Sequence, residues 1–302
     1  MRPATMSYRD VSALLKSAAV NWVHDYAQSM GAALAFYTMF SIAPLLLIVI
    51  SVAGMAFGED AARSEIYGQL RDLLGAPGAS AVEGLLESAR KPAESVTATA
   101  LGTVLLFIGA TSVFAELQDA LDRIWRAPQK VRSVGLWGVV RARLLSFGMI
   151  LGIGFLLMVS LAFSAGLAAL NRWWDPLFDG WTSVANTIDL AVSVVLSTAV
   201  FAMIYKAMPR VRIDWRDVWV GATFSSLLFI AGKFLIGVYI GRSSISSGFG
   251  AAASLVVVLL WVYYSAQIFL FGAEFTWVYS HKFGSRKGEP LPVAAGVHPQ
   301  PD

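Results

Sequence analysis

Long apolar runs alternate along the chain with shorter segments that hold most of its charged residues. A helix needs about 20 mainly apolar residues to cross a hydrocarbon core of about 30 Å. Six runs reach that length, so the pattern predicts an all-α fold, a polytopic membrane helical bundle with six transmembrane helices. The predicted spans cover residues 31–57, 96–115, 144–170, 183–205, 218–240 and 249–279.

Amphipathic segments lie between and before these spans. Residues 1–30 are predicted to form an amphipathic N-terminal helix, because apolar side chains recur there at helical spacing. The insert 59–91 shows the same spacing in two short segments, which residues 75–78 separate. A third such stretch, 117–125, follows the second span. The tail 281–302 is rich in Gly and Pro and is predicted to be disordered.

Composition narrows the class of protein. The 302 residues are 57% hydrophobic and only 14% charged, whereas about 25% of the residues of a soluble domain are charged. This excludes an ordinary soluble enzyme. The six predicted spans together form a membrane domain that covers residues 31–280. Residues 59–91 form a helical insert on the outer side of this domain.

The distribution of Lys and Arg predicts the orientation. One set of connections, which includes the N-terminal segment and the tail, holds 16 of the 23 basic residues, and the opposite set holds six. Because basic residues concentrate on the cytoplasmic side, both termini are predicted to be cytoplasmic. The basic excess then reflects topology and anionic lipid, so membrane lipids are the expected partners and nucleic acid is not.

Charged residues inside the spans need a reason, because a central charge costs about 2.5–3.5 kcal/mol on insertion scales. Asp189 and Lys233 fall at similar depth in the fourth and fifth spans, which predicts a buried ion pair. The alternative is that Lys233 extends to the outer surface and Asp189 lies at the membrane interface.

The sixth span carries Gln267 and Glu274. Glu274 is expected near the cytoplasmic face, either as a structural tie or as a proton or substrate site, and Gln267 precedes it on a face that could line a polar cavity. The basic residues expected as partners of Glu274 lie at the inner ends of other spans: Arg141, Arg143, Arg210 and Arg212. Pro44 stands midway along the first span, where it removes a backbone hydrogen bond and predicts a kink.

A basic and aromatic cluster precedes the fifth span, on the predicted cytoplasmic side. One interpretation is positive-inside anchoring with an aromatic belt. The other is a phospholipid headgroup site, because guanidinium groups pair well with phosphate. The cluster consists of Arg210, Arg212, Trp215, Arg216 and Trp219.

Enzyme chemistry finds little support. The chain has no Cys and three scattered His, which argues against a zinc or di-metal site. The carboxylates Glu116, Asp119 and Asp122 spread over a helix without a magnesium-binding motif. We therefore expect no catalytic site, no metal and no cofactor.

Five motifs resemble one family. They are ALAFYTMFSIAPLLL, FAELQDALDRIW, MPRVRIDWRDVWVGA, GKFLIGVY and LLWVYYSAQIFLFGAEF, and they stand in the same order. Over about residues 15–280 the chain resembles the YihY/BrkB family of bacterial inner-membrane proteins, which was formerly mislabelled ribonuclease BN. The resemblance implies six spans and residence in the bacterial inner (cytoplasmic) membrane.

Two functions follow as hypotheses. The first, which the resemblance and the charges within the spans favour, is a transporter or lipid-moving protein of the envelope. The alternative is a non-transporting membrane scaffold that recruits envelope partners. Candidate protein partners are a second copy of the chain, in a homo-oligomer, and another protein of the envelope.

Overall fold

The computed structural model describes residues 7–90, 112–128, 181–242 and 253–289, together with five single helical positions between 148 and 166. These residues are helical or lie in turns, without a strand among them. The helices are α1 (Tyr8–His24), α2 (Ala27–Phe57), α3 (Glu59–Arg90), α6 (Trp181–Ala207), α7 (Trp215–Arg242) and α9 (Ala253–Lys282). A further helical segment covers residues 112–124.

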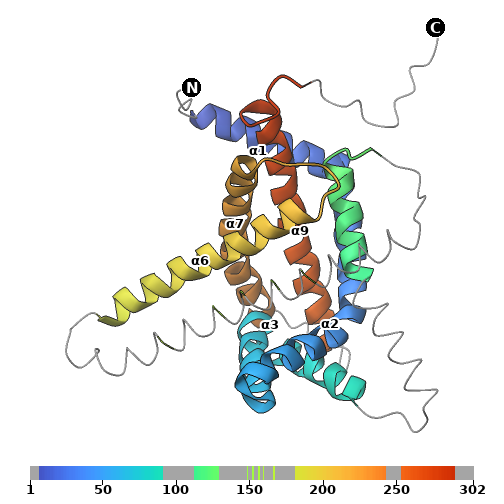
Figure 1. Cartoon of the computed structure of the whole chain (residues 1–302), viewed down its shortest axis with the longest axis vertical. Helices are drawn as coiled ribbons and strands as arrows, with labels where there is room; N and C mark the ends of the chain where they lie inside the picture. The colour runs from blue at the N-terminus through green and yellow to red at the C-terminus, as the bar shows by residue number, and fades with distance from the viewer. Residues whose placement is uncertain are drawn as a thin grey trace.

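The α9 helix runs through the middle of the molecule and packs against α1, α2, α3 and α7 (Figure 1). Apolar side chains from α1, α2, α6, α7, α9 and the 112–124 segment form one core around Leu121, Tyr205 and Leu270, which are fully buried. A smaller cluster around Val82 and Val258 joins α3 to the opposite end of α9. Because α1, α2, α3 and α7 all pack against α9, residues that are distant in the sequence lie close together around it.

Polar contacts fix the register of the three helices α6, α7 and α9. The hydroxyl of Tyr205 lies 2.8 Å from that of Ser225 and donates to the carbonyl of Phe269, also at 2.8 Å. A Cβ at Gly272 would overlap the Ser225 hydroxyl, so α9 approaches α7 closely only because this residue is glycine.

The described helices cover four predicted spans. α2, α6, α7 and α9 contain or overlap the runs at 31–57, 183–205, 218–240 and 249–279. Residues 96–111, and all but a few positions of 144–170, lie outside the described part of the chain. Among the described residues, two helical stretches are long and apolar enough to cross a membrane, Ser183–Ala207 and Leu255–Lys282, and α2 makes a third if its two arms count as one span.

The structure bears on two sequence-based expectations about the connections. The insert is assigned as one helix, α3, but its two halves fold back on each other: Leu70 and Val82 belong to one apolar cluster, and Glu83 is close enough to act on Tyr67, which a straight helix does not allow. The tail does not become disordered at residue 281, because α9 continues to Lys282 and residues 283–289 form turns. The buried carboxylate of Asp217 accepts hydrogen bonds from both the backbone N–H and the hydroxyl of Ser285, which fixes these turns against α7.

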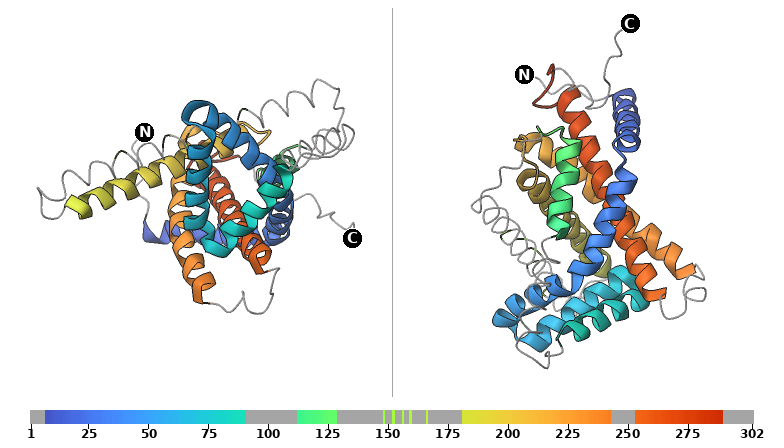
Figure 2. Two further views of the ribbon diagram at one scale, coloured as in Figure 1. Left: turned by 90° about the horizontal axis from the view of Figure 1, so that it is seen from below. Right: turned by 90° about the vertical axis from the view of Figure 1, so that its right-hand side faces the viewer.

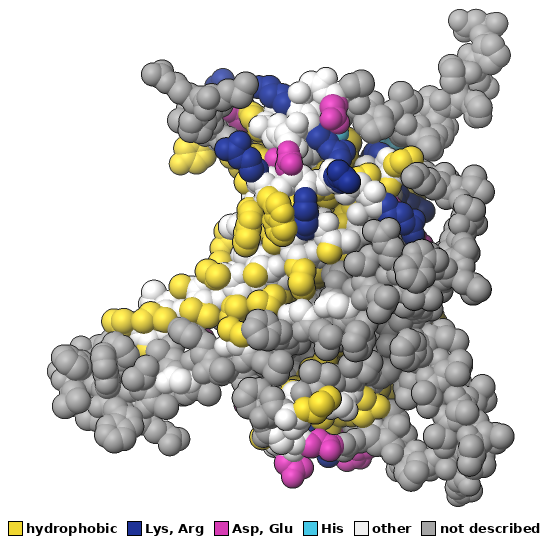
Figure 3. Space-filling view, viewed as in Figure 1, with side chains coloured by type: hydrophobic (Ala, Val, Ile, Leu, Met, Phe, Trp, Pro, Cys, Tyr) yellow, Lys and Arg dark blue, Asp and Glu magenta, His cyan; other side chains and the backbone are white. Residues whose placement is uncertain are grey.

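The shape and the surface suit a membrane. α6 leans away from the other helices, as two views agree (Figures 1 and 2), and its apolar side chains are exposed, Val195 by 65%. Figure 3 shows Lys and Arg gathered at the end where α1 meets the end of α9, a largely apolar middle, and Asp and Glu at the α3 end. Such an exposed apolar band between two polar ends is stable in lipid.

Candidate functional site

The structure places the predicted pair Asp189 and Lys233 on neighbouring helices. Asp189 is half-buried on α6, and Lys233 is exposed on α7. Within the described part of the chain, no ion pair joins the two residues. The exposed position of Lys233 fits the alternative in which its long side chain extends toward the membrane surface.

Glu274 is fully buried in α9. Neither of its carboxyl oxygens has a hydrogen-bond partner among the residues that the structure describes. The charged groups that act on it are Asp25 and Arg126. The sequence predicts other partners for Glu274. Of these, Arg210 contacts Asp122 and Asp119, and residues 141 and 143 lie outside the described part of the chain.

Asp25 and Arg126 form a buried ion pair beside Glu274. The Arg126 Nη1 donates to the Asp25 Oδ1 at 2.7 Å, and the Asp25 side chain is only 5% exposed. The second oxygen of Asp25, Oδ2, is buried and has no hydrogen-bond partner among the described residues. Together, Asp25, Arg126 and Glu274 form what we name the buried charged cluster.

Local backbone geometry holds this cluster in place. Asp25 ends α1, and the next residue, Tyr26, has a positive φ of 56° that turns the chain into α2. Arg126 itself has a φ of 52°, in a turn that the bond from the Ala127 N–H to the Asp122 carbonyl closes. Left-handed backbone at residues other than glycine costs energy and persists where the surroundings hold it, often at functional sites.

Aromatic rings complete the surroundings of the cluster on the α9 side. The Arg126 guanidinium lies 5.6 Å from the centroid of the Trp277 ring, a cation–π contact. His281 stacks on the same ring at 4.3 Å, while its Nδ1 lies 2.9 Å from the Trp277 carbonyl. On the Asp25 side, the Nδ1 of the exposed His24 lies 3.8 Å from the Asp25 Oδ1.

The charges in this cluster do not balance. Two carboxyl groups face one guanidinium, and among the described residues that guanidinium hydrogen-bonds to Asp25 and to the Arg123 carbonyl but not to Glu274. A buried ionised carboxylate without a partner is strongly unfavourable. The cluster is therefore a site that can take up one positive charge.

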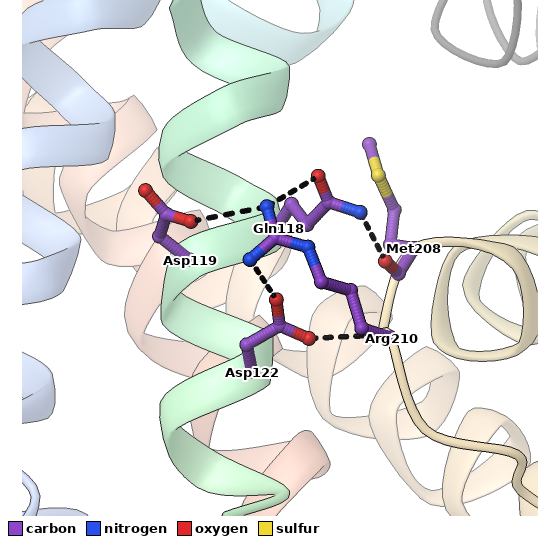
Figure 4. Close-up of polar contacts among 5 residues, drawn as sticks. All are labelled: Gln118, Asp119, Asp122, Met208 and Arg210. Carbon is purple, nitrogen blue, oxygen red and sulfur yellow. Dashed lines mark hydrogen bonds and ion pairs between the residues drawn. The ribbon is translucent and has the colours of Figure 1, made fainter. Parts of the chain in front are cut away.

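A second polar contact joins the 112–124 segment to the loop between α6 and α7 (Figure 4). The backbone N–H of Arg210 donates to the Asp122 Oδ1 at 2.7 Å, and the Arg210 Nη1 lies 3.0 Å from the Asp122 Oδ2. The Gln118 amide donates to the Met208 carbonyl at 2.9 Å, and the Asp119 Oδ1 lies 3.7 Å from the Arg210 Nη2. Burial raises the pKa of the Asp122 carboxyl, although the Arg210 N–H and guanidinium act in the opposite direction.

This contact occupies one member of the predicted headgroup cluster. Arg210 is held by protein carboxylates, while Arg212, Trp215, Arg216 and Trp219 are all exposed. Trp215 and Trp219 lie side by side with ring centroids 6.4 Å apart. These four residues form an exposed basic and aromatic face.

Gln267 and Pro44 mark two features of the α2–α9 contact. The Gln267 amide lies 3.5 Å from the carbonyls of Ala27 and Gln28, at the start of α2. At Pro44, α2 bends by 44° between Ala27–Ala43 and Leu45–Met55, where the sequence predicts a kink. Within the described part of the chain, no group of three or more His, Asp or Glu residues is placed to bind a metal ion.

A family model described as Virulence factor BrkB matches residues 18–295, almost the whole chain. The chain belongs to the Virulence factor BrkB family. This agrees with the resemblance that the five motifs indicate.

Similar proteins carry the same general description. A UPF0761 membrane protein of Pseudomonas paraeruginosa is 30% identical, over 90% of this chain and 64% of its own length. One from Pseudomonas aeruginosa is 31% identical, over 83% of this chain and 59% of its own length. This BrkB-family chain thus spans about three-fifths of the length of these relatives. No solved structure matches it.

The chain is therefore a helical integral membrane protein of bacterial type. Sequence reasoning found Glu274 but missed Asp25 and Arg126, because both lie outside the apolar spans to which the search for costly charges was confined. One signal was present: Arg126 directly follows the motif FAELQDALDRIW.

Proposed function

We propose that this protein is a six-span transporter or lipid-moving protein of the bacterial inner membrane, with both termini in the cytoplasm. The observation that carries the proposal is the buried charged cluster, in which Glu274 has no hydrogen-bond partner among the described residues. Polar groups buried in membrane helix bundles are costly, and they typically mark substrate or ion pathways. A purely structural tie would be expected to pair its carboxylate with a donor.

The orientation rests on the charge distribution over the surface. Lys and Arg gather at the end that holds α1 and the end of α9 (Figure 3), and the Lys282 Nζ donates to the Ser17 hydroxyl at 2.8 Å, joining the two helices there. The positive-inside rule assigns this end to the cytoplasm. The buried charged cluster then lies toward the cytoplasmic side.

The expected substrate is a lipid or an amphipathic solute. The face formed by Arg212, Trp215, Arg216 and Trp219 is exposed near the proposed cytoplasmic boundary, where guanidinium groups and indole rings can contact phospholipid headgroups. The scaffold alternative requires no movement of any substrate, so a transport measurement separates the two functions.

The test is reconstitution of the full chain into liposomes that contain fluorescent phospholipids. Wild-type protein is expected to move the probe between leaflets faster than in empty vesicles, and Glu274→Gln should abolish most of the gain. Glu83→Gln, on the exposed surface of α3, serves as the matched control and should behave like wild type. Lipid movement that equals that of empty vesicles would favour the scaffold.

A further inference from the structure

We propose that Asp25 and Glu274 bind one exchangeable proton between their carboxyl groups, so that the buried charged cluster is a protonation site. The binding of the proton stands on the geometry alone, whereas its use as the coupling ion of transport rests on the proposed function. The first support is that two carboxyl groups, of the fully buried Glu274 and the 5% exposed Asp25, lie beside one guanidinium, that of Arg126, whose side chain is 20% exposed.

Hydrogen bonding shows which atoms need a proton. The Arg126 guanidinium occupies the Asp25 Oδ1 and leaves the Asp25 Oδ2 and both Glu274 oxygens buried without partners among the described residues. The Glu274 carboxyl lies against that of Asp25, close enough for a hydrogen bond between them. A proton on Glu274 would donate to Asp25, which gives partners to both side chains at once.

Charge leads to the same result. With both carboxyl groups ionised, the cluster would carry a net negative charge beside an apolar core, where an unpaired ion is strongly unfavourable. Two carboxyl groups at such short range do not both ionise easily, and a shared proton is the usual solution. With one proton bound, the cluster is neutral.

The other titratable groups on the packed helices have contacts of their own and do not neutralise the second carboxylate. Asp217 of α7 binds Ser285, and Tyr205 of α6 is hydrogen-bonded to Ser225 and Phe269. His281 of α9 stacks on Trp277 instead of contacting Glu274. His24 of α1 lies 3.8 Å from the Asp25 oxygen that Arg126 already occupies, and it is exposed to solvent.

The position of the cluster suits exchange with one side of the membrane. It lies where the α1–α2 turn and the turn after the 112–124 segment meet α9, two turns that hold Tyr26 and Arg126 in left-handed backbone conformations. His24, 68% exposed, connects Asp25 to solvent. A small rearrangement of either turn would open the cluster to cytoplasmic water.

Infrared spectroscopy of the full chain in liposomes tests the proposal without requiring transport. Wild-type protein at pH 7 should show the carbonyl band of a neutral, buried carboxylic acid, and this band should shift in D₂O. Glu274→Gln should remove it, Asp25→Asn should shift it, and Glu83→Gln should leave it unchanged. Absence of the band from wild-type protein, or its persistence in Glu274→Gln, would overturn the proposal.

Failures of the two proposals are distinguishable. If Glu274→Gln does not fold, the wild-type band and its shift in D₂O decide the matter alone. A neutral acid band together with no lipid movement would end the proposed function and leave the proton site. Lipid movement without the band would do the reverse.

Discussion

Single residues decide whether the buried charged cluster is stable. Arg126 donates a short hydrogen bond to Asp25, and its guanidinium lies over the face of the Trp277 ring. Its backbone is in the left-handed conformation. The energy spent on that conformation is recovered through these contacts. Removal of Arg126 should therefore be costly, although the residue lies in a connection.

Arg126→Ala leaves the buried Asp25 carboxylate without its cation, so we expect a loss of about 3–5 kcal/mol in the free energy of unfolding. Denaturant titration in detergent measures the loss. Arg63→Ala removes a surface ion pair with Glu59 one helical turn away and should cost less than about 1 kcal/mol. Equal losses in the two variants would show that Arg126 is an ordinary surface residue.

At the scale of elements, close helix contacts and one loop contact hold α9 and the 112–124 segment in place. Gly272→Ala would place a methyl group into the Ser225 hydroxyl and beside Tyr205. We expect it to lower the free energy of unfolding by about 1–3 kcal/mol through overpacking. Gly68→Ala in α3 meets open space and should stabilise by up to about 1 kcal/mol. A harmless Gly272→Ala would mean that α7 and α9 do not approach as described.

The burial of Asp122 predicts a pH dependence of stability. Burial raises the pKa of Asp122, so the folded protein holds this proton more strongly than the unfolded chain does. Stability should therefore fall as pH rises from the ordinary carboxyl pKa through the raised one. Asp122→Asn should flatten the thermal stability profile at pH values above the ordinary carboxyl pKa of about 4. An unchanged profile would contradict the assignment.

The sequence predicts elements better than it predicts the cluster. Apolar runs locate α2, α6, α7 and α9, because each run has a length that only a membrane helix needs. The pair of Asp25 and Arg126 joins residues 101 positions apart, and no local pattern carries that information. By contrast, Gly and Pro at 75–78 are a local signal, and they lie between the two halves of α3 that fold back on each other.

At the scale of the whole molecule, the two polar ends predict the topology. The basic end holds α1, which begins at Tyr8, and the turns after α9, which include Lys287, whereas the acidic end holds α3, which carries Glu83. Because the chain has no Cys, each position can carry a single cysteine. An impermeant maleimide added to intact cells should label Glu83→Cys, and it should label Tyr8→Cys and Lys287→Cys only after the membrane is opened. Labelling of all three in intact cells would refute the orientation.

The central claim is that the buried charged cluster takes up a proton as part of transport. The most direct measurement is proton flux into liposomes that contain the full chain and a pH-sensitive dye, under an imposed membrane potential. The account predicts a flux above that of empty vesicles that Glu274→Gln reduces about tenfold or more, in line with the loss of an essential intramembrane charge, while Glu83→Gln retains it. Equal flux in wild type and Glu274→Gln would contradict it.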